Sequence, residues 1–167
     1  MLKLLVPCMM VNTLYDIKFT ELKQRGIRGI AFDIDNTIIP WNSPDICPEV
    51  LVWLNNLAAQ DFKLCFVSNN GKRRVRKIAE QCGVPFVARA LKPSRRGFRQ
   101  AAQTMELRPE TVAVVGDQLF TDILGGNRLG MVTIWVKPLT TKEFIGTKVT
   151  RQLEKLAVHL LKVTGRL

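Results

Sequence analysis

The sequence predicts an α/β fold in which three layers (helices, a mainly parallel central sheet, and helices) make one domain. Three observations support this prediction. First, apolar runs typical of strands alternate with helix-like stretches along most of the 167 residues. Second, the strand-like runs are continuous stretches of Val, Ile, Phe and Leu, which is typical of parallel strands buried on both faces. Third, strand–helix–strand alternation favours right-handed crossovers and a doubly wound sheet.

The expected elements follow one another with local start and stop signals. Strands are expected at 28–35, 62–69, 85–90, 111–116 and 131–136, and helices at 48–60, 72–82, 94–105, 121–129 and 142–163. Gly83 and Gly130 follow the second and fourth helices as stops, and Ser94 is a cap directly after Pro93. Because no linker or repeat interrupts this order, we expect a single domain over residues 1–167, with a core at about 27–138 and a C-terminal helix at about 142–163.

The apolar N-terminal stretch, residues 1–11, contains Pro7 and lacks a small-residue cleavage site, which argues against a signal peptide. We expect it to form an edge segment packed on the core, and contact with a membrane surface is the alternative. The sequence has no apolar run of about 18 residues, the length typical of a membrane span. The expected location is therefore the cytoplasm, with a peripheral position at a membrane as the alternative.

Charge and residue usage narrow the class of function. The chain carries 25 Lys and Arg against 14 Asp and Glu, a formal net charge of +11, which favours phosphate esters, nucleic acid or anionic lipids as partners. The basic run at 72–77 is interpreted as a solvated helix face, with an anionic membrane or nucleic acid as alternatives. The single histidine, His159, argues against a Ser-His-Asp triad and a multi-histidine metal site. The four cysteines form no C-x-x-C pair, which indicates reduced thiols.

Polar side chains follow the expected strands at the points where they end. Ligands of open α/β sheets bind at the carboxyl ends of the strands, so these side chains are expected to converge. The first strand ends in Asp33 and Asp35, whose like charges are costly to bury without a compensating cation. The other polar residues near strand ends are Ser68 and Asn69, Lys92, Asp117 and Asp122.

This set of residue types suits metal-assisted phosphoryl transfer. Asp33, Asp117 and Asp122 supply the hard oxygen ligands that Mg²⁺ prefers. Lys92 binds a phosphoryl group as a point charge, and Ser68 donates a hydrogen bond to it. Asp33 is a candidate nucleophile at phosphorus, and Asp35 is a candidate general acid and then base at the leaving oxygen.

Four motifs in the same order resemble the haloacid dehalogenase (HAD) superfamily of phosphatases. They are Asp33-Ile-Asp-Asn-Thr37, Ser68-Asn-Asn70, Lys92-Pro93 and Gly116-Asp-Gln-Leu-Phe-Thr-Asp122. The match spans roughly residues 27–138. The segments 33–41 and 116–127 are more narrowly similar to the YqeG family, whose relatives include mitochondrial and plastid phosphatidylglycerophosphate phosphatases.

The resemblance implies a three-layer, Rossmann-like HAD fold and a role for each matching residue. Asp33 is then the nucleophile and Asp35 the general acid/base. Magnesium is held by the Asp33 carboxylate, the Asp35 backbone carbonyl and Asp117, with Asp122 in support. The phosphate-binding residues are Ser68, Asn69, Lys92 and Thr37, and Thr37 also shapes the loop after the nucleophile.

The motif spacing leaves no room for the cap domain that many HAD enzymes carry. Only 35 positions separate Asp33 from Ser68, and 24 separate Ser68 from Lys92. A domain needs roughly 50 residues or more. We therefore expect a capless enzyme whose open site suits a bulky substrate, unless a partner subunit closes it. Trp41 is interpreted as core packing, with a place at the substrate entrance as the alternative.

The expected function is Mg²⁺-dependent hydrolysis of a phosphomonoester through an aspartyl-phosphate. Phosphatidylglycerophosphate, or a related phospholipid headgroup phosphate, is the favoured substrate, with peripheral contact to an anionic membrane. Two alternatives stay open. One is a HAD phosphatase for nucleic-acid ends, sugar phosphates or phosphoproteins. The other is a basic module that binds nucleic acid or the ribosome and has a vestigial site. The oligomeric state is left open.

Overall fold

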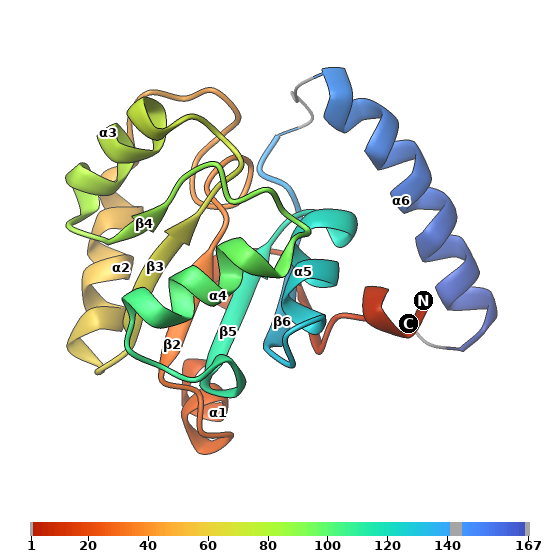
Figure 1. Cartoon of the computed structure of the whole chain (residues 1–167), viewed down its shortest axis with the longest axis horizontal. Helices are drawn as coiled ribbons and strands as arrows, with labels where there is room; N and C mark the ends of the chain where they lie inside the picture. The colour runs from red at the N-terminus through yellow and green to blue at the C-terminus, as the bar shows by residue number, and fades with distance from the viewer. Residues whose placement is uncertain (1, 141–144, 166–167) are drawn as a thin grey trace.

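A parallel six-stranded sheet forms the centre of the molecule (Figure 1). The structure is a computed structural model that describes residues 2–140 and 145–165. The strand order is β1-β6-β5-β2-β3-β4, and every pairing is parallel. The strands are β1 (Met9–Val11), β2 (Gly29–Phe32), β3 (Lys63–Val67), β4 (Phe86–Val87), β5 (Val112–Gly116) and β6 (Val132–Val136). The predicted mainly parallel α/β fold is confirmed.

Helices cover both faces of this sheet. They are α1 (Phe19–Gln24), α2 (Pro48–Ala59), α3 (Lys72–Cys82), α4 (Arg95–Thr104), α5 (Leu124–Asn127) and α6 (Ile145–Val163). A π-helical turn, η4 (Leu119–Ile123), precedes α5, and short 3₁₀ turns lie at Leu2–Leu5, Leu14–Asp16 and Pro109–Thr111. In Figure 1, α4 and α5 lie in front of the strands, and α2 lies behind them.

Two separate cores hold the layers together, because neighbouring residues of a buried strand point to opposite faces. Ile30 and Phe32 of β2 pack toward α2 and α3, in a cluster that includes Leu54 and Ile78. Ala31, between them, packs on the other face in a cluster with residues of α4. Both faces of the central strands are therefore apolar, and this explains why the strand sequences show no polar alternation.

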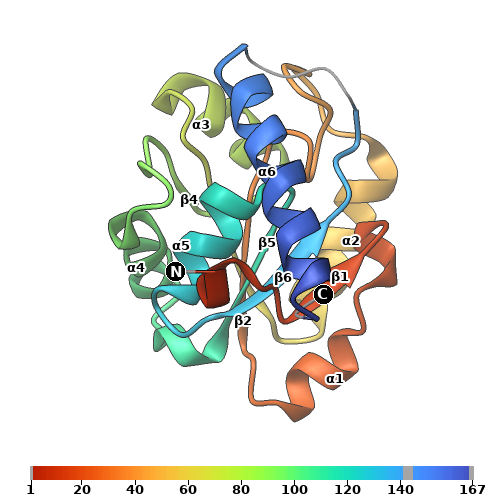
Figure 2. The same cartoon turned by 90° about the vertical axis from the view of Figure 1, so that its right-hand side faces the viewer.

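The N-terminal and C-terminal segments meet beside β6. β1 pairs with β6 at the edge of the sheet, which confirms the expected edge segment. Helix α6 packs through Ala157 and Leu161 on Leu5 and Leu124, and Figure 2 shows it running past the N-terminal turn. The helix was expected from residue 142; it is described from Ile145, and residues 142–144 lie outside the described part. Within the described ranges no helix has the length and hydropathy needed to cross a bilayer.

The structure also departs from the expected elements. The third strand was expected at 85–90 but covers only Phe86–Val87, because the chain turns away into a loop that hydrogen-bonds to the end of β3. Helix α1 and the strand β1 were not predicted as regular elements, since each is short. The remaining expected strands are present, although β2 ends at Phe32 instead of residue 35 and β3 ends at Val67 instead of residue 69. Their carboxyl ends lie at one edge of the sheet, and the predicted site residues follow them there.

Candidate active site

A buried lysine joins two carboxylates at the carboxyl ends of the strands. The Lys92 Nζ atom lies 2.5 Å from Oδ1 of Asp33 and 2.6 Å from Oδ1 of Asp122. All three residues are buried, and Asp122 is 1% exposed. Asp33 directly follows β2, Lys92 lies in the loop after β4, and Asp122 lies in η4. The parallel sheet therefore brings together three charges that are far apart in sequence.

Burial and neighbouring charges shift the ionisation of this cluster. Burial alone would lower the pKa of Lys92, but the charges of Asp122 and Asp33 outweigh it and hold that pKa above the ordinary value. Lys92 is therefore protonated. Burial raises the pKa of Asp33 from 3.8 to about 7, against the opposing effect of Lys92. The Asp122 charge contributes to this rise, which indicates that one lysine does not neutralise the acids around it.

The acids of the site fit a hard divalent cation. One carboxylate oxygen from each of Asp33, Asp117 and Asp122 lies within 4.8 Å of the other two, and all three residues are buried. Carboxylate oxygens at this spacing are suitable ligands for Mg²⁺, which prefers a few carboxylates and completes its shell with water and substrate oxygens. The raised pKa of Asp33 agrees with this fit, since a bound cation would offset the excess negative charge.

Gly116 gives Asp122 the space that it occupies. A Cβ atom at position 116 would lie 2.3 Å from the Asp122 Cγ atom, closer than two such atoms can approach. The Asp122 carboxylate has little freedom to move, because Oδ1 accepts from Lys92 and Oδ2 accepts from the Gln118 N–H at 3.2 Å. The glycine is thus a steric requirement of the acid cluster.

Replacing Gly116 by Ala is therefore expected to displace Asp122 and to lower the free energy of unfolding by about 1–3 kcal/mol, the usual cost of overpacking a core. Chemical denaturation measures this loss, and titration with Mg²⁺ measures the accompanying fall in metal affinity. Gly71→Ala is the control, because a Cβ atom there meets nothing within 4 Å. Equal metal affinity in the Gly116→Ala and unmodified proteins would contradict the role given to Gly116.

Asp35 has a cation of its own. The Arg74 side chain donates to Asp35 Oδ1 at 2.6 Å, and the Asn70 side chain donates to Oδ2 at 2.6 Å. The Asn42 N–H also donates to Oδ1, at 3.4 Å. Arg74 further donates to the Ser43 carbonyl at 3.0 Å, so it links Asp35 to a later part of the same loop. The two motif aspartates are thus paired with two different cations, Lys92 and Arg74.

This pairing departs from the interpretation of 72–77 as a solvated face. The Arg74 side chain is 25% exposed, whereas its neighbours Arg73 and Arg76 are exposed. The signal in the sequence is position: α3 begins five residues after the end of β3, so a side chain in its first turn lies near the site. Neither Arg74 nor Asn70 was predicted as a site residue.

Replacing Arg74 by Met is expected to lower kcat about tenfold to a hundredfold, because a misplaced catalytic group costs on that order. KM for a small phosphate ester is expected to change less, and Arg74→Lys is expected to restore part of kcat. Steady-state kinetics on a chromogenic phosphate ester measures both constants. Arg76→Met, on the exposed side of the same helix, is the matched control, and an equal fall in kcat there would contradict a specific role for Arg74.

Ser68 and Asn69, which follow β3, shape the loop after β4 that carries Lys92. The Ser68 side chain is 2% exposed, and its Oγ atom accepts from the Asn70 N–H at 3.1 Å. Asn69 holds the Lys92 backbone on both sides: Oδ1 accepts from the Lys92 N–H at 2.7 Å, and Nδ2 donates to the Lys92 carbonyl at 3.3 Å. The contacts of Asn69 indicate that it positions Lys92, and its predicted contact with phosphate stays a prediction.

Backbone strain gathers in the same loop. Arg89 has a φ of +50° and Leu91 a φ of +55°, in the left-handed region that side-chain-bearing residues rarely adopt. Each such position costs about 1–3 kcal/mol and tends to occur at functional sites, where the surrounding structure enforces it. The Arg89 N–H donates to the Asn70 carbonyl at 3.0 Å, so the end of β3 enforces this conformation.

The loop after Asp33 is organised by Thr37 and Asn36. Thr37 is 1% exposed, and its hydroxyl donates to Asp117 Oδ1 at 3.4 Å. Asn36 has a φ of +62° and accepts through Oδ1 from the Trp41 N–H and from the Thr140 hydroxyl. Thr37 thus lies against a proposed metal ligand, and its predicted contact with phosphate stays a prediction. Asn36 was not predicted as an organising residue.

No inserted domain covers the site, and three exposed apolar side chains lie on loops near it. Between β2 and β3 the chain forms a loop and α2, and between β3 and β4 it forms α3, so no domain is inserted at either place within the described residues. Trp41 is 36% exposed, which contradicts its interpretation as a core residue; the loop held by Asn36 carries it outward. Leu91 (67% exposed) and Leu139 (49% exposed) lie on two other loops next to Lys92 and Asn36.

Comparison with known proteins identifies relatives across most of the chain. A family model described as mitochondrial PGP phosphatase matches residues 2–140. The Bacillus subtilis protein named "Probable phosphatase YqeG" is 38% identical over 165 residues, which cover 99% of this chain and 96% of that protein. Phosphatidylglycerophosphate phosphatase 1 of Arabidopsis thaliana is 24% identical over 94% of this chain, which spans only 47% of that protein.

Solved structures share the fold. YfnB of Bacillus subtilis, a HAD-family protein solved with bound magnesium, superimposes with a TM-score of 0.56. The superposition covers 72% of this chain and 91% of YfnB, at 15% sequence identity. At that identity the likeness shows the fold and does not by itself assign residues or a substrate.

Proposed function

The chain belongs to the family described as mitochondrial PGP phosphatase, within the HAD superfamily of phosphatases, and we propose that it is a Mg²⁺-dependent phosphomonoesterase whose nucleophile is Asp33. A further part of the proposal is that residues 1–167 form one domain. The observation that carries the proposed mechanism is the buried contact of Lys92 with Asp33 and Asp122, beside Asp117. If the pair of Lys92 with Asp33 had only a structural role, it would not need two further buried acids, Asp117 and Asp122, beside it.

The proposed reaction has two steps. In the first, an Asp33 carboxylate oxygen attacks phosphorus, the bond from phosphorus to the ester oxygen breaks, and Asp35 gives a proton to the departing alcohol. In the second, Asp35 takes a proton from water, the water oxygen attacks phosphorus, and the Asp33 carboxylate leaves as inorganic phosphate forms. Lys92 and the Ser68 hydroxyl stabilise the phosphoryl oxygens in both steps.

Asp33, Asp117 and the Asp35 backbone carbonyl would hold the Mg²⁺ ion, with Asp122 in support. When bound, this ion supplies charge neutralisation at the phosphoryl oxygens and orients the ester. The chain's own residues supply the nucleophile, the proton transfer and the fixed lysine charge. Asp122 contacts Lys92 and also belongs to the acid cluster. It therefore links phosphate binding to metal binding.

The favoured substrate is phosphatidylglycerophosphate or a phospholipid with a similar terminal headgroup phosphate. The names of the Arabidopsis relative and of the matching family support this substrate. An open site, a net charge of +11 and the exposed side chains of Trp41, Leu91 and Leu139 also suit an anionic lipid that remains partly in a bilayer. We further propose that the protein works at the cytoplasmic surface of a membrane without spanning it.

A panel of phosphate esters tests this proposal. It contains phosphatidylglycerophosphate in mixed micelles, phosphatidic acid, a sugar phosphate, a phosphopeptide and a 5′-phosphorylated oligonucleotide, each with Mg²⁺ and with a chelator. We expect release of inorganic phosphate that requires Mg²⁺ and is fastest with phosphatidylglycerophosphate. Faster turnover of a soluble ester would contradict the lipid substrate. Salt-sensitive RNA binding without turnover of any ester would instead favour the nucleic-acid-binding alternative.

A further inference from the structure

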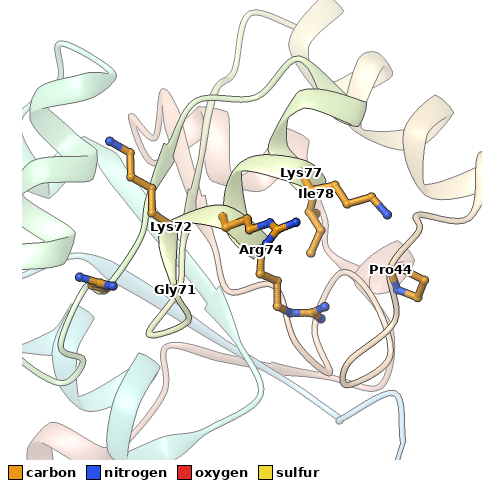
Figure 3. Close-up of a pocket in the computed structure, with 8 residues that line it drawn as sticks. Pro44, Gly71, Lys72, Arg74, Lys77 and Ile78 are labelled. Atoms are coloured by element: carbon orange, nitrogen blue, oxygen red, sulfur yellow. The ribbon is translucent and has the colours of Figure 1, made fainter.

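A cationic pocket lies next to Asp35, which it reaches through the Arg74 side chain. It has a volume of about 640 Å³, and five of its lining side chains are basic: Lys72, Arg73, Arg74, Lys77 and Arg89. Pro44, on the loop after β2, faces α3 across the pocket, and Figure 3 shows Lys77 reaching toward it while Lys72 points away. The pocket is thus lined by α3, the loop that carries Arg89, and the loop that also holds Arg74 through Ser43.

Most of this positive charge has no acidic partner among the described residues. In the part of the chain that the structure describes, Lys72, Arg73 and Arg89 form no ion pair. Lys77 lies 3.8 Å from Asp45, but both side chains are more than 60% exposed, so this pair contributes little. Nor do Lys72 and Arg73 stabilise α3, because they lie in its first turn, where acids, not bases, interact favourably with the helix dipole. The charge is therefore available to an external anion.

The position of Asp35 decides which part of a substrate reaches this pocket. In the proposed mechanism Asp35 protonates the leaving alcohol, so that alcohol lies on the Asp35 side of the phosphoryl group. Arg74 contacts Asp35 at 2.6 Å and also lines the pocket, so only the Arg74 guanidinium group separates Asp35 from the pocket. A charged group a few bonds away from the leaving oxygen lies within reach of the pocket.

Resting on the proposed function, we propose that this pocket binds a second phosphate carried by the leaving alcohol, so that the preferred substrates are small polyol esters with two phosphates. The second phosphate is either a monoester or the diester that joins a headgroup to a lipid. Arg73, Lys77 and Arg89 together match the charge of such a group, and arginine donates to phosphate oxygens with bidentate geometry. The pocket then sets specificity, while Lys92 and the acid cluster perform the reaction.

Three soluble substrates separate this inference from simple phosphatase activity. Glycerol 3-phosphate has one phosphate, glycerol 1,3-bisphosphate adds a second monoester, and glycerophosphoglycerol phosphate adds a diester in its place. We expect kcat/KM for each two-phosphate substrate to be at least about tenfold higher than for glycerol 3-phosphate, because one good charge-assisted contact provides a gain of this size. Phosphatidylglycerophosphate in mixed micelles shows whether the same dependence holds when the diester belongs to a lipid.

The matched variants remove pocket charge without touching the acid cluster. In the triple variant Arg73→Gln, Lys77→Gln, Arg89→Gln, the advantage of the two-phosphate substrates is expected to fall about tenfold or more. Turnover of glycerol 3-phosphate is expected to stay within about twofold, which also shows that the variant is folded. Arg108→Gln is the control. Arg108 is exposed and precedes β5, so it lies at the amino-terminal ends of the strands, opposite the site.

The outcomes distinguish the two proposals. If the unmodified protein hydrolyses all three esters without preference, or if the triple variant keeps the preference, the pocket inference is wrong and the proposed phosphatase function stands. If none of the esters, soluble or lipid, is hydrolysed, the proposed function fails and the inference fails with it. A 5′-phosphorylated dinucleotide turned over faster than the glycerol substrates, with the same dependence on the pocket, would overturn the assignment to small polyol esters.

Discussion

Replacing Asp33 by Asn is expected to reduce kcat for any phosphate ester by at least about 10⁴-fold, the scale seen when an essential nucleophile is removed. The amide is almost isosteric with the carboxylate but is a far weaker nucleophile. Phosphate release under saturating Mg²⁺ measures the loss. Asp61→Asn is the matched control, because Asp61 is exposed and its φ of +64° suits asparagine. Residual activity within tenfold of the unmodified protein would contradict the nucleophile assignment.

The same substitution is expected to stabilise the metal-free protein. Burial raises the Asp33 pKa from 3.8 in the unfolded chain to about 7 in the folded one, so the folded state holds this proton more tightly. The stabilisation due to that proton is complete below pH 3.8 and is lost as the pH rises through about 7. At pH 8 the folded protein therefore contains a carboxylate that destabilises it.

We expect the Tm of the Asp33→Asn protein in chelator to exceed that of the unmodified protein by a few degrees at pH 8, and by less at pH 5. Added Mg²⁺ is expected to raise the Tm of the unmodified protein more than that of the variant, since the variant lacks one proposed ligand. Differential scanning calorimetry at both pH values makes the comparison. A lower Tm for the variant at pH 8 in chelator would show that the ion pair with Lys92 outweighs the burial of Asp33.

Replacing Lys92 by Met is expected to reduce both stability and activity. The substitution leaves the buried carboxylates of Asp33 and Asp122 without the cation that contacts both. Breaking a buried pair in this way costs about 3–5 kcal/mol. The free energy of unfolding, from urea denaturation in chelator at pH 8, measures the cost. Turnover is expected to fall about 10³-fold, on the scale of a lost group that stabilises transition-state charge.

A surface lysine provides the control for Lys92. Lys63 pairs with Glu106 at 3.3 Å, but the two side chains are 50% and 84% exposed, so Lys63→Met is expected to cost at most about 1 kcal/mol. Mg²⁺ is expected to recover part of the stability of the Lys92→Met protein without restoring turnover, because the ion replaces charge but not the phosphate contact. If the two substitutions cost the same, the cluster has no special energetic role.

Much of the fold follows from local patterns in the sequence. The continuous apolar runs at β2, β3, β5 and β6 identify buried parallel strands, and the alternation with helices fixes the α/β class. The short β4 could not be bounded, because its end is set by hydrogen bonds from the end of β3 to the Arg89 loop, a tertiary contact. The strand β1 has three residues and depends on pairing with β6, so its own sequence carries little signal.

The candidate site also has one part that the sequence predicts and one part that it does not. Asp33, Lys92, Asp117 and Asp122 are found from strand-end position alone, because the carboxyl ends of parallel strands meet at one edge. Arg74 was hidden in a run of similar charges, and only the packing of α3 against the loop after β2 separates it from Arg73 and Arg76. Local patterns indicate which residues are charged, whereas the partner of each charge depends on tertiary geometry.

The central claim, that Asp33 carries the phosphoryl group during turnover, is tested most directly by trapping. The protein is mixed with a saturating phosphate ester and Mg²⁺, quenched in acid on the millisecond scale and digested for mass spectrometry. We predict that the peptide containing Asp33 gains the mass of one phosphoryl group, that reduction with borohydride converts residue 33 to homoserine, and that the Asp33→Asn protein shows neither change. Steady turnover with no phosphorylated peptide at any quench time, or with the phosphoryl group on another residue, would contradict the account.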